Sequence, residues 1–240
     1  LSAIDSTNLY LKKLASENTL ENFTVVVAEY QTKGRGQMGT KWLSLKAKNL
    51  TFSILIRVEK FKIEQQFYLS MAISLGIFNV LSGKVQLPLF IKWPNDILAV
   101  KDKVAGVLIE NNIGGCFIKH SIVGIGLNVN QEIFSNELEN VTSLKIITGQ
   151  TFNLDEVLLE IVNSIKRYVQ FIEEKKLKEL KKIYLKSLYK MNKPSMFKDK
   201  NNITFLGKII DVDENGRLAL ELENETIRKF NLKEIKFANR

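Results

Sequence analysis

The sequence has one cysteine, Cys116, and one histidine, His120, among its 240 residues. A single cysteine cannot form a disulfide within the chain, and it excludes a zinc site built from several cysteines. This cysteine usage fits a reducing compartment, so we expect a cytoplasmic protein. No stretch comes near the roughly 18 consecutive apolar residues of a membrane span. The N-terminus also lacks a basic segment followed by an apolar one, so neither a membrane partner nor a signal peptide is expected.

Cys116 and His120 are the only candidates for a cysteine–histidine nucleophilic pair. They lie four residues apart on a stretch with strand composition, so their side chains are expected on the same side of a strand. Same-side residues on a strand are more often ordinary core or surface positions, and we favour that interpretation.

The formal net charge is +9, and many lysines fall in one C-terminal segment. A solvated helix face is the interpretation that we favour for this run. Attraction to anionic substrates or to an acidic partner protein is the second interpretation. Nucleic-acid binding is the third, and the sequence shows no helix-turn-helix or RNA-binding motif, so we expect no nucleic-acid partner.

The segment from residue 24 to residue 42 is the most distinctive of the chain. A run of three valines predicts a buried strand, and a polar loop with glycines at positions 34, 36 and 39 follows it. Arg35 lies between two of these glycines, and Lys33 and Lys41 flank the loop. Exposed N–H groups together with cations predict a site for a phosphate or a carboxylate. Trp42 adds a flat surface suited to ring stacking.

The glycine loop also matches the GxGxxG pattern of dinucleotide-binding sites. That pattern requires a helix directly after the glycines. The next regular segment, residues 50–57, has strand composition instead. We therefore reject a dinucleotide site, and a surface turn with incidental charges stays as the alternative.

Two further segments place polar side chains at strand ends. Pro94 interrupts a short strand over residues 89–93 and places Asn95 and Asp96 on a turn, where a plain turn is the alternative. An antiparallel hairpin over residues 97–110 returns Lys103 toward Asp96. Gly124 and the glycine two residues later indicate close approach of backbone or ligand to the next strand.

These patterns predict an α+β fold in two domains. A helix with a capped start is expected at residues 6–8, and further helices are expected over residues 64–81, 152–172 and 177–188. They pack on a mixed, largely antiparallel sheet in a domain that spans residues 1–190. Short alternating strands follow a change of composition at residues 192–194, and they predict a small β-barrel over residues 191–240.

Several motifs together resemble the biotin–protein ligases, also called biotin–[acetyl-CoA-carboxylase] ligases. They are Asp5-Ser6-Thr7-Asn8, Ala28-Glu29-Tyr30-Gln31, Gly34-Arg35-Gly36 with Gly39 and Trp42, Lys92-Trp93-Pro94-Asn95-Asp96, Lys103-Val104-Ala105-Gly106 and Gly124-Ile125-Gly126-Leu127-Asn128. They occur in the order and spacing of that family. The resemblance implies a core like that of the class II aminoacyl-tRNA synthetases, followed by an SH3-like domain.

The resemblance implies a reaction in two steps. Biotin reacts with ATP, accompanied by Mg²⁺, to give biotinyl-5′-AMP and pyrophosphate. A lysine of a biotin carboxyl carrier protein, such as that of acetyl-CoA carboxylase, then takes the biotinyl group. A cationic glycine loop agrees with this chemistry because two anions must be brought together.

The resemblance also assigns roles to residues of this sequence. The implied catalytic residues are Arg35, Lys103 and Asp96. The implied biotin contacts are Ser6, Thr7, Asn8, Gln31, Arg35, Gly36, Gln37 and Lys103. The implied nucleotide contacts are Gly34, Arg35, Gly39, Trp42, Asn95 and Asn128. No metal site built by the protein is expected.

Two departures from the family pattern matter. Gln37 stands where many members have arginine, and Met38 where a basic residue is frequent. We expect Lys33 or Lys41 to compensate in holding the adenylate. Only a few residues precede Ser6, which leaves no room for the DNA-binding domain of some members, so a ligase without repressor function is expected.

Three rival interpretations stay open. A lipoate–protein ligase needs a long apolar tunnel, and residues 92–96 favour biotin instead. A non-catalytic module that binds nucleic acid predicts steeply salt-dependent binding without ATP turnover. A ligase-like fold that has lost activity is the third. A homodimer formed through an edge strand is also compatible with the sequence.

Overall fold

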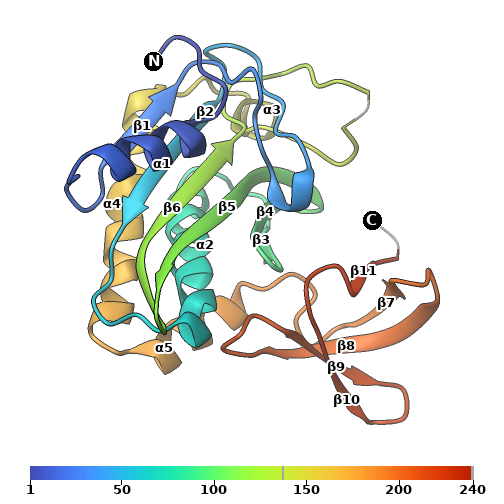
Figure 1. The fold of residues 1–240 in the computed structure, drawn as a ribbon. Helices are drawn as coiled ribbons and strands as arrows, with labels where there is room; N and C mark the ends of the chain where they lie inside the picture. Colours follow the sequence, from blue (N-terminus) through green and yellow to red (C-terminus); the bar gives the residue numbers. More distant parts are fainter. Residues whose placement is uncertain (137, 239–240) are drawn as a thin grey trace.

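The computed structural model describes residues 1–136 and 138–238, apart from the side chain of residue 38. Its strands form one six-stranded and one five-stranded sheet, and helices cover the larger sheet (Figure 1). Every pairing between the strands of these sheets is antiparallel within the described residues. This arrangement confirms the predicted α+β fold.

The larger sheet has the strand order β1-β2-β6-β5-β4-β3. These strands are β1 (Val25–Ala28), β2 (Leu50–Ile56), β3 (Leu89–Lys92), β4 (Asp96–Ala99), β5 (Asp102–Gly114) and β6 (Phe117–Leu127). The predicted hairpin corresponds to β4 and β5, which pair with a register shift between Ile97 and Leu98. The long pair of β5 and β6 forms the middle of the sheet and brings Gly106 opposite Gly126.

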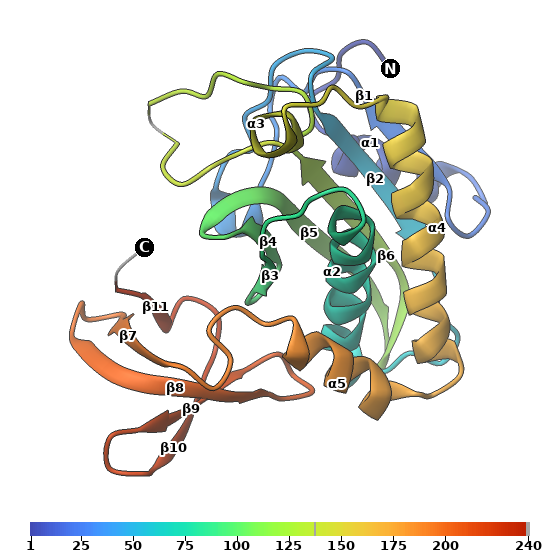
Figure 2. The same cartoon turned by 180° about the vertical axis from the view of Figure 1, so that it is seen from behind.

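Alternation along β2 explains why helices lie on both faces of this sheet. Phe52 and Ile54 point into the main core, whereas Leu55 belongs to a smaller cluster with Leu11 on the opposite face. The helices are α1 (Thr7–Glu17), α2 (Gln66–Ser82), α3 (Leu144–Thr148), α4 (Leu154–Glu173) and α5 (Leu177–Lys186), with short 3₁₀ turns at Gln37–Gly39 and Ile63–Gln65. Helices α2 and α4 cover the main-core face, and α1 covers the other (Figure 2).

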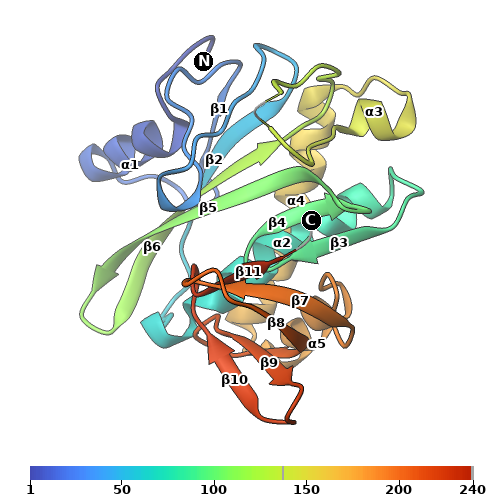
Figure 3. The same ribbon diagram turned by 90° about the vertical axis from the view of Figure 1, so that its right-hand side faces the viewer.

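The C-terminal strands form the second sheet, in the order β10-β9-β8-β7-β11. They are β7 (Pro194–Asp199), β8 (Thr204–Val212), β9 (Leu218–Leu222), β10 (Ile227–Phe230) and β11 (Ile235–Phe237). This sheet fits the expected SH3-like domain, and its closure into a barrel stays a prediction. It lies close to β3 and β4 of the larger sheet (Figure 3), and the Tyr189 and Phe237 rings meet at this junction with centroids 5.5 Å apart.

Some local predictions were wrong. Ser6 occupies the N-cap position of α1, but its side chain makes no capping hydrogen bond. Cys116 lies in the turn before β6 and is exposed, so it does not share a strand with His120. The short elements α3, β7 and β11 were not anticipated.

No helix among the described residues is long and apolar enough to cross a membrane.

Candidate active site

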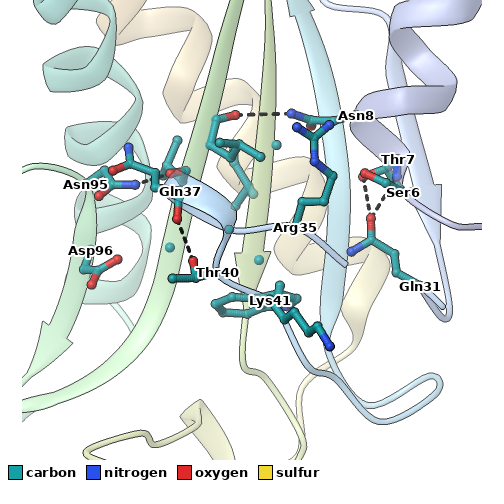
Figure 4. A pocket seen from close by; sticks show the side chains of 18 of the residues that line it. Ser6, Thr7, Asn8, Gln31, Arg35, Gln37, Thr40, Lys41, Asn95 and Asp96 are labelled. Carbon is teal, nitrogen blue, oxygen red and sulfur yellow. Dashed lines mark hydrogen bonds between the residues drawn. The ribbon is translucent and has the colours of Figure 1, made fainter. Parts of the chain in front are cut away.

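A cavity of about 280 Å³ lies where the glycine loop meets the larger sheet. Its walls come from the start of α1, the loop after β1, β2, the turn before β4, β5 and β6. Most residues expected at the site line it, namely Ser6, Thr7, Asn8, Gln31, Arg35, Gly36, Gln37, Trp42, Asn95, Asp96 and Lys103. Figure 4 shows Thr7 and Gln31 on one side of this cavity and Asn95 and Asp96 on the opposite side.

The other three expected residues lie elsewhere. Gly34 and Gly39 line a second cavity, of about 1070 Å³, on the outer side of the glycine loop. Asn128 lines neither cavity. It is buried, its Nδ2 donates to the carbonyl oxygen of Thr142 at 3.0 Å, and its Oδ1 has no hydrogen-bond partner among the described atoms. The nucleotide contact expected of Asn128 stays a prediction.

A chain of hydrogen bonds builds one end of the first cavity. Gln31 Oε1 accepts from the backbone N–H of Thr7 at 2.8 Å and from its hydroxyl at 3.1 Å. Ser53 Oγ lies 2.7 Å from Thr7 Oγ1 and 2.6 Å from Asn8 Oδ1. Thr7, Asn8 and Ser53 are at most 3% exposed, so these polar groups depend on one another for hydrogen bonding.

Glu110 of β5 extends this chain of hydrogen bonds to the glycine loop. Its Oε2 accepts from Asn8 Nδ2 at 2.8 Å, and its Oε1 lies 3.4 Å from Arg35 Nη2. Because a carboxylate only accepts, Glu110 fixes the Asn8 amide with its oxygen toward Ser53. Arg35 is therefore held beside Asn8, as Figure 4 also shows.

The opposite end of the cavity holds an ion pair. Lys103 Nζ lies 2.7 Å from Asp96 Oδ1, and both side chains are only partly exposed. The same ammonium lies 5.6 Å from the centroid of the Trp42 ring. Asn95 Nδ2 donates to the carbonyl oxygen of Val107, which ties the turn before β4 to β5. The hairpin prediction that Lys103 returns toward Asp96 is confirmed.

Three glycines on β5 and β6 make room for these side chains. A Cβ on Gly124 would overlap the Asn8 amide, and one on Gly126 would overlap the Trp42 ring. A Cβ on Gly106 would lie 2.9 Å from Lys103 Cε and Nζ. The predicted close approach at Gly124 and Gly126 is confirmed, and side chains of the site itself make it.

The second cavity adjoins the first and has a different character. Seven residues line both cavities, and the glycine loop forms most of this common wall: Gln31, Arg35, Gly36, Thr40, Lys41, Trp42 and Leu108. Its remaining lining is more apolar and includes Tyr30, Leu43, Leu45, Ile133 and Phe134. A flat, partly apolar molecule suits such a surface, whereas the first cavity suits a compact polar ring.

Residues 1–128 match the model of the biotin/lipoate A/B protein ligase family. The chain belongs to this family. The matched stretch contains all the motifs on which the resemblance to biotin–protein ligases rests.

Two relatives of this chain are named as ligases. The bifunctional ligase/repressor BirA of Bacillus subtilis is 31% identical over 232 residues, which cover 94% of this chain and 69% of that protein. The biotin–[acetyl-CoA-carboxylase] ligase of Mycobacterium tuberculosis is 33% identical over 129 residues, covering 52% of this chain and 47% of that protein.

Solved structures agree with the sequence relatives. The biotin protein ligase of Aquifex aeolicus in complex with biotin and ATP superposes with a TM-score of 0.82 at 31% sequence identity. The match covers 99% of this chain and 97% of that one. The predicted resemblance to the biotin–protein ligases is confirmed.

The sequence did not lead us to predict two polar residues of this site. Ser53 is a fully buried serine within the apolar strand β2, and Glu110 is an acid near the middle of β5. The polar residue inside a hydrophobic run was the available signal for Ser53. Glu110 carried no local signal, because only the fold brings β5 beside Asn8 and Arg35, about 100 and 75 positions away in the sequence.

Within the described part of the chain, no group of three or more His, Cys, Asp or Glu residues is placed to hold a metal ion. Magnesium prefers oxygen ligands, and the phosphates of ATP supply these.

Proposed function

We propose that this ligase family member joins biotin to a lysine of a biotin carboxyl carrier protein, through biotinyl-5′-AMP. The observation that carries the proposal is the first cavity, with a fixed hydrogen-bonding end and an ion pair at the opposite end. It lies in a chain that is similar over almost its whole length to a biotin protein ligase in complex with biotin and ATP.

The hydrogen-bonding end suits the ureido ring of biotin, which carries two N–H donors and one carbonyl acceptor. Thr7 occupies the oxygen of the Gln31 amide, so the Gln31 nitrogen is left to donate to a ligand. Ser6 and Asn8 stand beside it in the same wall. We assign the ureido contacts to these four residues.

The ion-pair end suits the first chemical step. A carboxylate oxygen of biotin attacks the α-phosphorus of ATP, the bond from that phosphorus to the bridging oxygen breaks, and pyrophosphate leaves. Both reactants are anions, and Lys103 supplies a positive charge where they meet. Arg35, Gly36 and Gln37 stand in the loop that lies over this cavity, and we assign them to closing over biotin and the α-phosphate.

The second step transfers the biotinyl group to the carrier lysine. Its neutral amine attacks the carbonyl carbon of the mixed anhydride, an amide forms, and AMP leaves with the electron pair of the broken bond. Asp96 accepts hydrogen bonds only, so it orients either Lys103 or the incoming amine. The amine loses a proton as the amide forms, and we assign the Asp96 carboxylate as the acceptor of that proton.

The nucleotide is placed in the second cavity. Trp42 lines both cavities, so its ring stands at the boundary where adenine would stack. Gly34 and Gly39 bring backbone to the second cavity, and Asn95 lines the first cavity from the turn before β4. Magnesium arrives with ATP on its phosphates.

We also propose the domain division at residue 190. Residues 1–190 carry both cavities, and residues 191–240 carry the five-stranded sheet. A homodimer, the absence of a nucleic-acid partner and the cytoplasmic location stay predictions.

The test is exchange of labelled pyrophosphate into ATP, with biotin, with lipoate and with neither, using the wild type and Lys103→Ala. Exchange with biotin alone, lost in Lys103→Ala, supports the proposal. Exchange with lipoate alone overturns the substrate assignment. No exchange with either acid in a folded protein overturns adenylation altogether.

A further inference from the structure

The turn between β8 and β9, residues 213–217, extends from the C-terminal sheet and packs against the domain that contains the six-stranded sheet. The carbonyl oxygen of Gly216 accepts a hydrogen bond from Trp93 Nε1 at 2.9 Å, and this contact is buried. Trp93 itself is 8% exposed. Because Trp93 begins the turn that ends at Asp96, the C-terminal sheet directly contacts the segment that carries the ion pair.

Gly216 fits this place in two independent ways. Its φ is +82°, in the left-handed region that favours glycine. A Cβ there would also overlap the Phe67 ring of α2. With glycine at position 216, the backbone of the turn lies closer to α2 than a residue with a Cβ would allow.

Two polar contacts hold the same turn and its strand in place. Tyr68 Oη lies 3.3 Å from Glu214 Oε1, and Lys181 Nζ lies 2.8 Å from Asp211 Oδ2. These contacts come from α2 and α5, which flank the junction. The attachment of the β8–β9 turn therefore involves several elements, and Trp93 is its point of contact with the site.

The turn from Trp93 to Asp96 is fixed on its other side by the sheet that forms the cavity. Asn95 donates to the carbonyl oxygen of Val107, and Asp96 pairs with Lys103 at 2.7 Å. Pro94, between these residues, lines the cavity. The turn is thus held between β5 and the C-terminal sheet, and a shift of Trp93 would move Asp96 relative to Lys103.

We infer that Trp93 and Gly216 are positioning residues for adenylation, and that their hydrogen bond holds the Asp96–Lys103 pair in its reactive arrangement. The inference rests on the proposed function. The ureido contacts lie at the opposite end of the cavity from Asp96 (Figure 4), so losing the bond lowers kcat and changes the KM for biotin little. A shift of about 1 Å in such groups costs up to about 100-fold in rate.

The test compares Gly216→Ala with Gly149→Ala in the pyrophosphate exchange assay. Gly149 also has positive φ, +73°, but a Cβ there meets nothing within 4 Å and the residue lines neither cavity. Both variants carry the backbone strain, and only Gly216→Ala displaces the turn. We expect a kcat at least about tenfold lower for Gly216→Ala alone, with the KM for biotin within about twofold of wild type. Equal kcat values for the two folded variants overturn the inference.

Trp93→Phe keeps the inference testable if Gly216→Ala fails to fold, because it removes the N–H donor and retains an aromatic ring. It should lower kcat in the same way. The double variant should lose no more than the worse single variant, since both changes remove one bond, and independent losses that multiply count against the inference. A wild type without biotin-dependent exchange contradicts the proposed function instead, so the two failures are distinguishable.

Discussion

Replacing Gly124 by alanine should damage the hydrogen-bonding end of the first cavity, where we propose that biotin binds, through a single side chain. The new Cβ would occupy the position of the Asn8 amide, which is 2% exposed and hydrogen-bonded on both sides. The Asn8 side chain would have to move by about 1 Å to restore ordinary contact distances. Since Glu110 and Ser53 hold it, that movement breaks hydrogen bonds rather than adjusting a free side chain.

The size of the effect follows from the bonds that are lost. A hydrogen bond to a charged group such as the Glu110 carboxylate contributes about 1.5–3 kcal/mol, and the neutral bond to Ser53 about 1 kcal/mol. Partial relaxation of the strands reduces the sum, so we expect the free energy of unfolding to fall by about 2–3 kcal/mol. Biotin affinity should weaken at least about tenfold, because the groups that we propose to bind the ureido ring would no longer be correctly placed.

The matched control is Gly114→Ala on the same strand pair. A Cβ at Gly114 would overlap Lys119, but only at the far end of a flexible, exposed side chain that can swing away. Urea unfolding and calorimetric titration with biotin measure both variants. If Gly124→Ala and Gly114→Ala are equally stable and bind biotin equally well, the argument that Asn8 is fixed in place is wrong.

Three further predictions concern other parts of the molecule. Burial, followed by nearby cations, lowers the pKa of His120 from its ordinary value of 6.5. The unfolded chain therefore takes up a proton at a higher pH than the folded protein does. The free energy of unfolding should keep its full value above about pH 6.5 and should decrease as the pH falls toward the folded-state pKa. His120→Asn should flatten this part of a urea-unfolding series between pH 7 and 5, and an unchanged slope contradicts the assignment. Lys33→Ala and Lys41→Ala should speed dissociation of the adenylate several-fold in a filter-retention assay, and unchanged release in both means that they do not compensate for Gln37. Glu110→Gln keeps the shape but loses the charge that holds Arg35, so the KM for biotin should rise about threefold to tenfold, whereas Glu29→Gln, at an exposed ion pair with Lys46, should leave it unchanged.

Much of the larger sheet was predictable because its signals are local. The valines of β1 and the apolar run of β2 are each readable within about ten residues, and α2 is one largely apolar segment of 17 residues. The short elements α3, β7 and β11 have too few residues for a period to show, and they form because long-range contacts hold them. Sequence reasoning alone also placed Cys116 on a strand, when the tight turn between β5 and β6 takes it out.

The site was predictable to the extent that its residues sit in recognisable motifs. Asp96 and Lys103 are close in sequence, and a hairpin brings them together. Glu110 is different, because only the pairing of β5 within the sheet places it beside α1 and the glycine loop. The hydrogen bond between Gly216 and Trp93 joins residues 123 positions apart, so no local sequence pattern predicts it.

The common wall between the two cavities has a thermodynamic consequence. A ligand in one cavity that orders the glycine loop also orders the wall of the other cavity. The second ligand to bind therefore causes a smaller loss of conformational entropy. Linkage then requires the effect to be mutual, and the factor by which biotin raises the affinity for nucleotide must equal the factor by which nucleotide raises the affinity for biotin. On the proposed placement, an adenylate would span both cavities and hold this loop from both sides, so its escape would require the shared wall to open.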